Sequence, residues 1–145
     1  TCLNLLEDIT KEKGGIPFPN KVSFISQNWK KYPALIQDST LVTKIIDIEK
    51  TINGRAYYYI PKEKVLPFAG QIKTGDIILI TTKKKGLDTA HVGIAIENEG
   101  QIYLLHASVS DKKVSVTTET LPDYLQRITS HSGIMIGRLI NFKSN

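Results

Sequence analysis

The chain has 145 residues and a mass of 16.2 kDa, which is enough for one domain with a hydrophobic core and too little for two ordinary domains. A composition of 41% hydrophobic and 23% charged residues excludes fibrous and disordered classes, and a single cysteine excludes an internal disulfide framework. The net charge is +5, but only three of the 19 basic residues are arginines, which does not favour sequence-specific reading of nucleic acid.

The positive charge also suits an anionic membrane surface or an acidic polymer such as a cell wall. No apolar run approaches the roughly 18 residues that a membrane span needs. The chain begins at Thr1 with neither an initiator methionine nor a visible signal peptide, so we expect a processed or trimmed form. We expect a single domain over residues 1–145, with an upstream N-terminal segment possible, and a monomer.

The N-terminal part of the chain is predicted to be largely helical. Leucine and isoleucine spacing predicts a short first helix that ends at Gly14-Gly15, and Pro33 separates two further helices. A tyrosine-rich run before Pro61 predicts a strand. The predicted elements here are helices over residues 2–9, 23–32 and 39–53 and a strand over residues 57–60.

After Gly70 the pattern changes to short strands bounded by turn residues. The predicted elements are strands over residues 77–81, 91–97, 101–106, 114–117 and 134–140, with a helix over residues 121–128. The sequence therefore predicts an α+β domain in which N-terminal helices pack on an antiparallel sheet of about five strands.

Two histidines lie on neighbouring predicted strands. If the turn between these strands centres between Asn98 and Glu99, His91 faces His106 directly, with Cβ atoms roughly 4.5–5.5 Å apart. Such a pair can act as a general base and its orienting partner, because one imidazole fixes the tautomer of the other. A register slip by one residue would place them on opposite faces, and both could also be sheet-end residues without chemistry.

The predicted histidine face also carries Gly93 and Ala95, whose small side chains leave room for another element to approach. The opposite face carries an ordinary apolar surface that includes Val92 and Ile94. The third histidine, His131, is expected to lie in a polar loop without a chemical role.

Only Cys2 can supply a thiolate within this chain. The predicted first helix would begin there, and the N–H groups and dipole of a helix start lower the pKa of a thiol. A lone cysteine is also often a small buried hydrophobic residue, so the position alone leaves both interpretations open.

Short motifs in the C-terminal half occur in the order in which one family carries them. They are Gly75-Asp76-Ile77-Ile78, Gly86-Leu87-Asp88, His91-Val92-Gly93, Leu104-Leu105-His106-Ala107-Ser108 and Gly133-Ile134. With this pattern, over residues 22–140 at least, the chain resembles the N-acetylmuramoyl-L-alanine amidase-like family within the NlpC/p60 cysteine peptidase superfamily. The resemblance implies a papain-like, NlpC-type fold.

The resemblance also implies roles for three residues. His91 matches the general base, His106 matches the orienting residue, and Cys2 is the candidate nucleophile. The family's cysteine motif is roughly Asp-Cys-x-Thr-aromatic-x-Glu, of which this chain keeps only Cys2 and Glu7. A second alignment matches Asp8-Ile9-Thr10 and Gly14-Gly15 to a segment that follows the cysteine helix in longer relatives; the nucleophile would then lie upstream of Thr1.

The function implied is cysteine-dependent hydrolysis of an amide in peptidoglycan or muropeptides, outside the cytoplasm of a bacterium and without a metal or cofactor. The bond implied is the N-acetylmuramoyl–L-alanine amide, although sister families cleave the γ-D-glutamyl–diamino acid bond. Tyrosines 57–59 either stack on the substrate or form a core strand. The alternatives are a catalytically incomplete wall-binding module and a basic nucleic-acid-binding domain.

Overall fold

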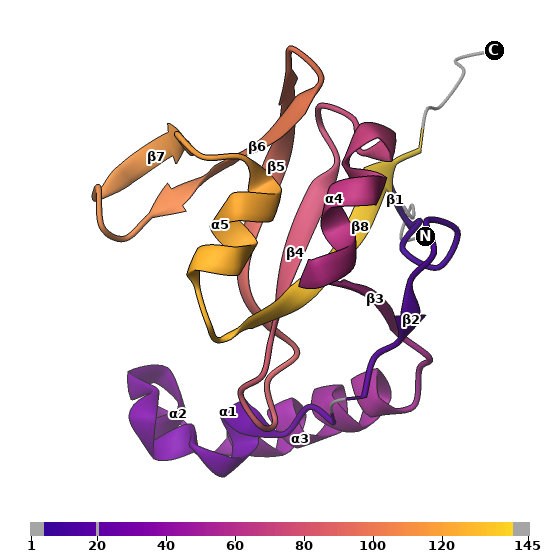
Figure 1. Ribbon diagram of the computed structural model, residues 1–145. Coiled ribbons are helices and arrows are strands. Elements are labelled where there is room, and N and C mark those ends of the chain that lie inside the picture. The colour runs from indigo at the N-terminus through magenta and orange to yellow at the C-terminus, as the bar shows by residue number, and fades with distance from the viewer. Residues whose placement is uncertain (1–4, 20, 141–145) are drawn as a thin grey trace, which may run out of the picture.

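The computed structural model describes residues 5–19 and 21–140, and its centre is a strongly twisted antiparallel sheet (Figure 1). The sequence-predicted α+β class is confirmed, but the described sheet has eight strands instead of about five. The strands are β1 (Leu6–Asp8), β2 (Ile16–Pro17), β3 (Tyr58–Pro61), β4 (Ile77–Thr82), β5 (Thr89–Asn98), β6 (Gln101–Ser108), β7 (Lys113–Val116) and β8 (His131–Leu139).

The last strand in the chain, β8, lies in the middle of the sheet, whose order is β2-β3-β8-β4-β5-β6-β7. Along one edge β8 pairs with β4, so that Ile80 lies beside Ile134. Along the other edge it pairs first with β3 and then with β1, where Leu6 lies beside Leu139. The sheet therefore joins the two ends of the described chain.

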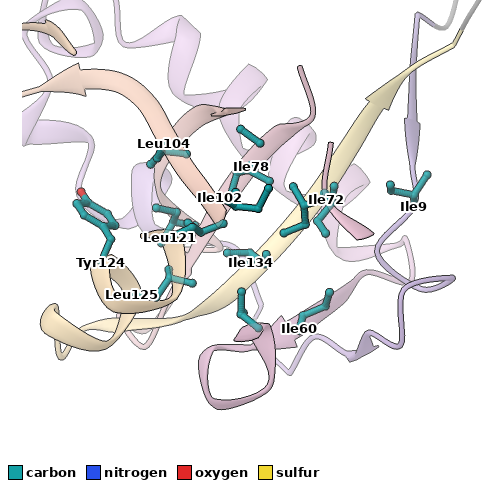
Figure 2. Packing of buried hydrophobic residues seen from close by; sticks show 14 residues of the cluster. Ile9, Ile60, Ile72, Ile78, Ile102, Leu104, Leu121, Tyr124, Leu125 and Ile134 are labelled. Carbon is teal, nitrogen blue, oxygen red and sulfur yellow. The ribbon is translucent and has the colours of Figure 1, made fainter. Parts of the chain in front are cut away.

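One face of the sheet is covered by the helices α4 (Val65–Phe68) and α5 (Leu121–Arg127) (Figure 1). Thr120 begins α5 by accepting a hydrogen bond from the Asp123 N–H, and Pro122 occupies the first turn, where no N–H is needed. These helices contribute Val65, Leu121 and Leu125 to a core that otherwise consists mainly of isoleucines from the strands (Figure 2).

The N-terminal helices do not contribute to this core. They are α1 (Phe24–Gln27), α2 (Pro33–Gln37) and α3 (Thr40–Asn53), and they lie together beyond one end of the sheet (Figure 1). Short 3-10 helices η1 (Trp29–Lys31), η2 (Lys62–Lys64) and η3 (Ala69–Gln71) complete the elements. The face that holds the main core is thus covered by α4 and α5 and not by the N-terminal helices, while Ile52 at the end of α3 lines a pocket with Leu79 and Met135 of the other face.

The predicted helix over residues 2–9 is also wrong where the structure describes it, since Leu6–Asp8 form strand β1. The following Thr10 is fully buried, and its hydroxyl accepts a hydrogen bond from the Ile136 N–H at 2.8 Å. A Cβ on Gly15 would lie 2.7 Å from the Thr10 carbonyl oxygen, so the turn requires glycine there. The segment from Asp8 to Gly15 thus anchors the N-terminal part of the chain on β8.

The second face of the sheet is also apolar, and its part on β5 to β7 is uncovered. It carries Val92 and Ile94 of β5, with exposed fractions of 52% and 39%, and Val114 and Val116 of β7, which are also exposed. Leu105 lies between them, because it pairs with both Ile94 and Val116. Within the described part of the chain, no helix is long and apolar enough to cross a membrane.

Candidate active site

A two-residue turn sets the register of the hairpin that carries the histidine pair. Asn98 pairs with Gln101, and the two turn residues, Glu99 and Gly100, have φ angles of +51° and +77°. Positive φ at both positions is typical of the type I′ turn whose twist matches a hairpin. The hairpin therefore centres between Glu99 and Gly100, one residue later than the sequence suggested.

This register corrects the expected direct opposition of the two histidines. The ladder pairs Ile94 with Leu105, and its continuation places His106 opposite Gly93 instead of opposite His91. The shift changes the pairing by two residues, so both histidines stay on one face as diagonal neighbours. The predicted shared face is confirmed, because His91 Nε2 lies 2.7 Å from His106 Nδ1, with the two rings nearly perpendicular at 88°.

The hydrogen bond uses Nε2 of His91 and leaves its other ring nitrogen, Nδ1, free to accept a proton. No described residue hydrogen-bonds that atom. Burial, followed by the charge of His106, lowers the pKa of His91 below 6.5, so its imidazole is neutral at neutral pH. If His91 donates its Nε2–H to His106, as the 2.7 Å contact allows, Nδ1 carries the lone pair that a general base needs.

The pair lines a pocket of about 450 Å³ between the ends of β5 and β6, strand β7, helix α5 and the start of β8. The pocket lining also includes five residues with hydroxyl groups, Ser108, Ser110, Ser115, Thr117 and Thr118, of which Ser115 pairs with His106 across the strands. Arg127 lines it as well, with its guanidinium held 2.7 Å from the Glu119 carboxylate. The pocket therefore presents mainly uncharged hydrogen-bonding groups next to an imidazole base.

His131 belongs to the same pocket, although the sequence predicted a loop residue without a role. It is the first residue of β8, only 5% exposed, and its ring lies 5.7 Å from that of Tyr124, which in turn contacts His106 at 5.5 Å. Burial, with smaller contributions from nearby cations, lowers its pKa to about 4. The available sequence signal was the position of Ser130-His131-Ser132 directly before a buried β-strand.

The face around Gly93 and Ala95 is not open for another element. Both residues are buried, and a Cβ on Gly93 would lie 2.6 Å from the side chain of Leu104. The glycine accommodates this core leucine, and α4 and α5 cover this face in place of the predicted first helix, whose described residues Leu6–Asp8 form strand β1. Cys2 itself lies outside the described residues.

Metal chemistry receives no support from the described residues. Across residues 5–19 and 21–140, no group of three or more His, Cys, Asp or Glu side chains is arranged to hold a metal ion. Tyrosines 57–59 do not line the histidine pocket; Tyr59 contacts the Phe18 ring edge-on at 5.4 Å.

A family model described as AmiA-like, N-acetylmuramoyl-L-alanine amidase-like, matches residues 1–134. The chain belongs to this family. Its sequence is 35% identical to that of an N-acetylmuramoyl-L-alanine amidase from Bacteroides uniformis, and the crystal structure of that protein matches this one with a TM-score of 0.85. That match covers 94% of this chain and 58% of the other.

Two further solved structures share this fold. A Bacteroides fragilis protein described as a candidate xylanase is 36% identical, with a TM-score of 0.83, over 92% of this chain and 59% of the other. A Legionella pneumophila protein assigned to DUF1460 shares the fold at 21% identity and a TM-score of 0.64, over 94% of this chain and 57% of the other. This chain thus spans less than two thirds of each relative's length. A comparison with curated proteins finds no significant match.

One family-like motif, Gly75-Asp76, proves to be structural. Asp76 is 2% exposed and accepts hydrogen bonds from Arg138 Nε and Nη2 at 2.8 and 2.7 Å. It also accepts one from the Lys73 N–H at 2.9 Å. Gly75 adopts a φ of +95°, which favours glycine. The motif holds the start of β4 against the end of β8, at the end of β4 remote from the histidines.

Proposed function

We propose that this chain carries the base and orienting residue of a cysteine-dependent amide hydrolase that acts on peptidoglycan or muropeptides. The observation that carries the proposal is the 2.7 Å contact between His91 Nε2 and His106 Nδ1 at a pocket lined by hydroxyl groups. Membership of an amidase-like family supports the reaction type. A papain-like fold within the NlpC/p60 superfamily is part of the proposal.

In the proposed reaction, His91 Nδ1 accepts the proton of a cysteine thiol, and the thiolate attacks the amide carbonyl carbon. A thioester forms when the C–N bond breaks, and the His91 imidazolium protonates the departing amine. His91 then takes a proton from water as the water attacks the thioester, which releases the acid and restores the thiol. His106 accepts the Nε2–H bond throughout and so keeps Nδ1 directed at the nucleophile.

Cys2 is the proposed nucleophile. The register of the sheet limits how close its sulfur can come to His91. His91 lies beside Ile80 and hence one strand further from Ile134, whereas Leu6 lies at the level of Leu139. Three strand spacings and five residues along β8 put Leu6 and His91 about 22 Å apart, while four residues span at most about 14 Å. Cys2 would have to extend fully toward the histidines for its sulfur to reach His91.

The Cys2→Ser variant decides between the two sources of the thiol. If Cys2 is the nucleophile, the variant loses all hydrolysis. If hydrolysis needs a cysteine from a longer polypeptide, this chain alone shows no turnover, and Cys2→Ser in the longer protein retains it. Full activity of Cys2→Ser in the chain itself would contradict the cysteine mechanism.

The histidines are tested with muropeptides that contain an N-acetylmuramoyl–L-alanine amide, with products identified by mass spectrometry. We expect His91→Ala to lower kcat/KM by about 10²–10⁴-fold, as loss of a general base does. His106→Asn retains a hydrogen-bonding group, so we expect a smaller loss of about tenfold in kcat. Tyr103→Phe, on the other face of the sheet, is the matched control. Equal and mild losses in both histidine variants would contradict the assignment.

The products also identify the bond. Free L-alanyl peptide supports cleavage of the N-acetylmuramoyl–L-alanine amide, whereas cleavage after D-glutamate would assign the chain to the other specificity. The proposal also includes that the chain acts as a monomer outside a bacterial cytoplasm, where peptidoglycan lies, and that it needs no metal. Activity that survives a chelator checks the metal-free mechanism.

A wall-binding module without turnover is the second candidate. Strand β1 runs away from the histidines toward residue 5, and the matched structures are considerably longer than this chain. Sedimentation with purified peptidoglycan tests this candidate: retention of the wild-type chain together with no product from any muropeptide would favour it over the enzyme.

A further inference from the structure

The imidazole of His131 has one nitrogen that faces the protein interior without a partner. Its Nδ1 is the single buried side-chain polar atom among the described residues that lacks a hydrogen bond. The ring nevertheless lines the histidine pocket. Nε2 has no hydrogen-bond partner among the described residues and is not buried as Nδ1 is, so it is the ring nitrogen left to face the pocket.

This arrangement selects one tautomer. An orphaned buried N–H is rarer in proteins than an under-satisfied acceptor, so the proton of the neutral ring belongs on Nε2. Burial, together with the positive charges of His91, Lys62 and Arg127, keeps the pKa of the ring at about 4. At neutral pH His131 therefore offers an uncharged N–H to the pocket.

The donor is held in place from two sides. The His131 N–H of the backbone donates to the Ile128 carbonyl at 3.1 Å, where α5 leads into β8. The ring lies against Tyr124, tilted by 38°, and the same tyrosine contacts His106. Tyr124 thus fixes the distance between the donor and the catalytic pair.

We propose that His131 is a substrate-binding residue that donates its Nε2–H to an uncharged oxygen, a carbonyl or a hydroxyl, of the sugar–peptide bound in the histidine pocket. This inference rests on the proposed function and adds a specificity-determining residue to that site. The serine and threonine residues that also line the pocket suit the same uncharged, oxygen-rich ligand. A carboxylate at this position would instead favour a charged imidazole.

Nitrogen-15 NMR of the histidine side chains tests the inference directly. The probe is N-acetylmuramoyl-L-alanyl-D-isoglutamine, added to the full chain carrying His91→Ala so that the probe is not hydrolysed. We expect the free protein to show His131 as a neutral ring with its proton on Nε2, and the probe to shift that N–H downfield. A proton on Nδ1, or a charged ring at pH 6, would overturn the inference.

The two proposals fail in different ways. Shifts at His106 without any shift at His131 would overturn the role of His131 and leave the proposed function standing. No shift at either histidine would show that the muramoyl peptide does not bind here, which contradicts both proposals.

Affinity of variants gives a second measurement. His131→Phe keeps the ring against Tyr124 but removes both nitrogens, and we expect it to weaken probe binding about tenfold, the value of one hydrogen bond. His131→Gln restores a donor and should recover part of the loss. Tyr103→Phe is the control, and thermal unfolding verifies that each variant is folded. Unchanged affinity in folded His131→Phe would overturn the inference.

Discussion

The two faces of the sheet have similar side chains but different surroundings. On one face Ile78, Ile80 and Leu104 are completely buried beneath α4 and α5, and the histidine pocket lies at its edge. On the other face Val92 and Ile94 are exposed over about half and two fifths of their surface. Both faces are apolar, but the second is packed only in part, around Met135, which is 6% exposed, while its β5–β7 side is open.

This difference shows that the alternation of apolar and polar residues along a strand is not enough to locate a binding pocket. A strand with apolar residues on both faces predicts burial on both sides. What distinguishes the face with the histidine pocket is the helix α5, since Tyr124 and Arg127 line the pocket and no other described helix does. The catalytic candidates lie where the packed face ends, not where the apolar surface is open.

The largest contrast between the faces is expected from a matched pair of isoleucines. Ile102, which is 2% exposed, lies in the core, while Ile94 lies on the open face. We expect Ile102→Ala to lower the free energy of unfolding by about 3 kcal/mol, because it removes buried surface and leaves a cavity. Ile94→Ala should cost about 1 kcal/mol or less. Urea unfolding measures both, and equal losses would show that the second face is also packed.

A smaller loss in the free energy of unfolding is expected from the ion pair between Asp76 and Arg138. Asp76→Asn removes the charge that holds the Arg138 guanidinium and places an amide N–H against one of its donors. We expect a loss of about 2 kcal/mol in the free energy of unfolding, since one partner of a largely buried pair stays unmatched. Glu63→Gln, at an exposed carboxylate, is the control. A loss below about 0.5 kcal/mol would show that the pair is not coupled to stability.

The buried histidine of the packed face makes stability depend on pH. The pKa of His131 is about 4 in the folded chain against 6.5 in the unfolded chain. The unfolded state therefore binds the proton first, and stability that is complete above pH 6.5 is lost as the pH falls toward 4. Between pH 6.5 and 5.5 we expect a loss of about 1 kcal/mol. His131→Phe should flatten this profile, and an unchanged profile in that variant would contradict the assignment to His131.

The smallest effect belongs to the open face. Val92→Thr keeps the β-branched shape and adds a hydroxyl where the side chain is 52% exposed. We expect the free energy of unfolding to change by less than about 0.5 kcal/mol. A loss above about 1 kcal/mol in chemical denaturation would mean that Val92 is covered in solution.

Much of the C-terminal fold could be predicted because each strand there has a local signal. The turn residues around Glu99-Gly100 separate two strands, and Thr120 caps helix α5. The predicted bounds of the strands and of this helix agree with the structure to within about three residues. The register of the hairpin could not be predicted, because the sequence Asn98-Glu99-Gly100 permits two turn centres. Only the left-handed conformation of Glu99 and Gly100 distinguishes them.

The N-terminal part was harder to predict because its structure depends on distant partners. Leu6–Asp8 has helical spacing, yet it forms a strand because the far end of β8 offers it an edge about 130 residues away in sequence. His131 was missed for a related reason: its surroundings come from α5 and not from its neighbours in the chain. The pairing of His91 with His106 could be foreseen because one short hairpin carries both.

The position of β8 also constrains the order in which the molecule is assembled. This strand is made last among the described elements, yet it separates β3 from β4 in the finished sheet. Before residues 131–139 leave the ribosome, β3 has no neighbour on that side, and β4 to β7 form a meander with an exposed edge at β4. Closing the sheet then joins segments far apart in sequence, which is slow compared with local pairing. Until that step, the unpaired edge of β4 is where the nascent chain is most exposed to association with other strands.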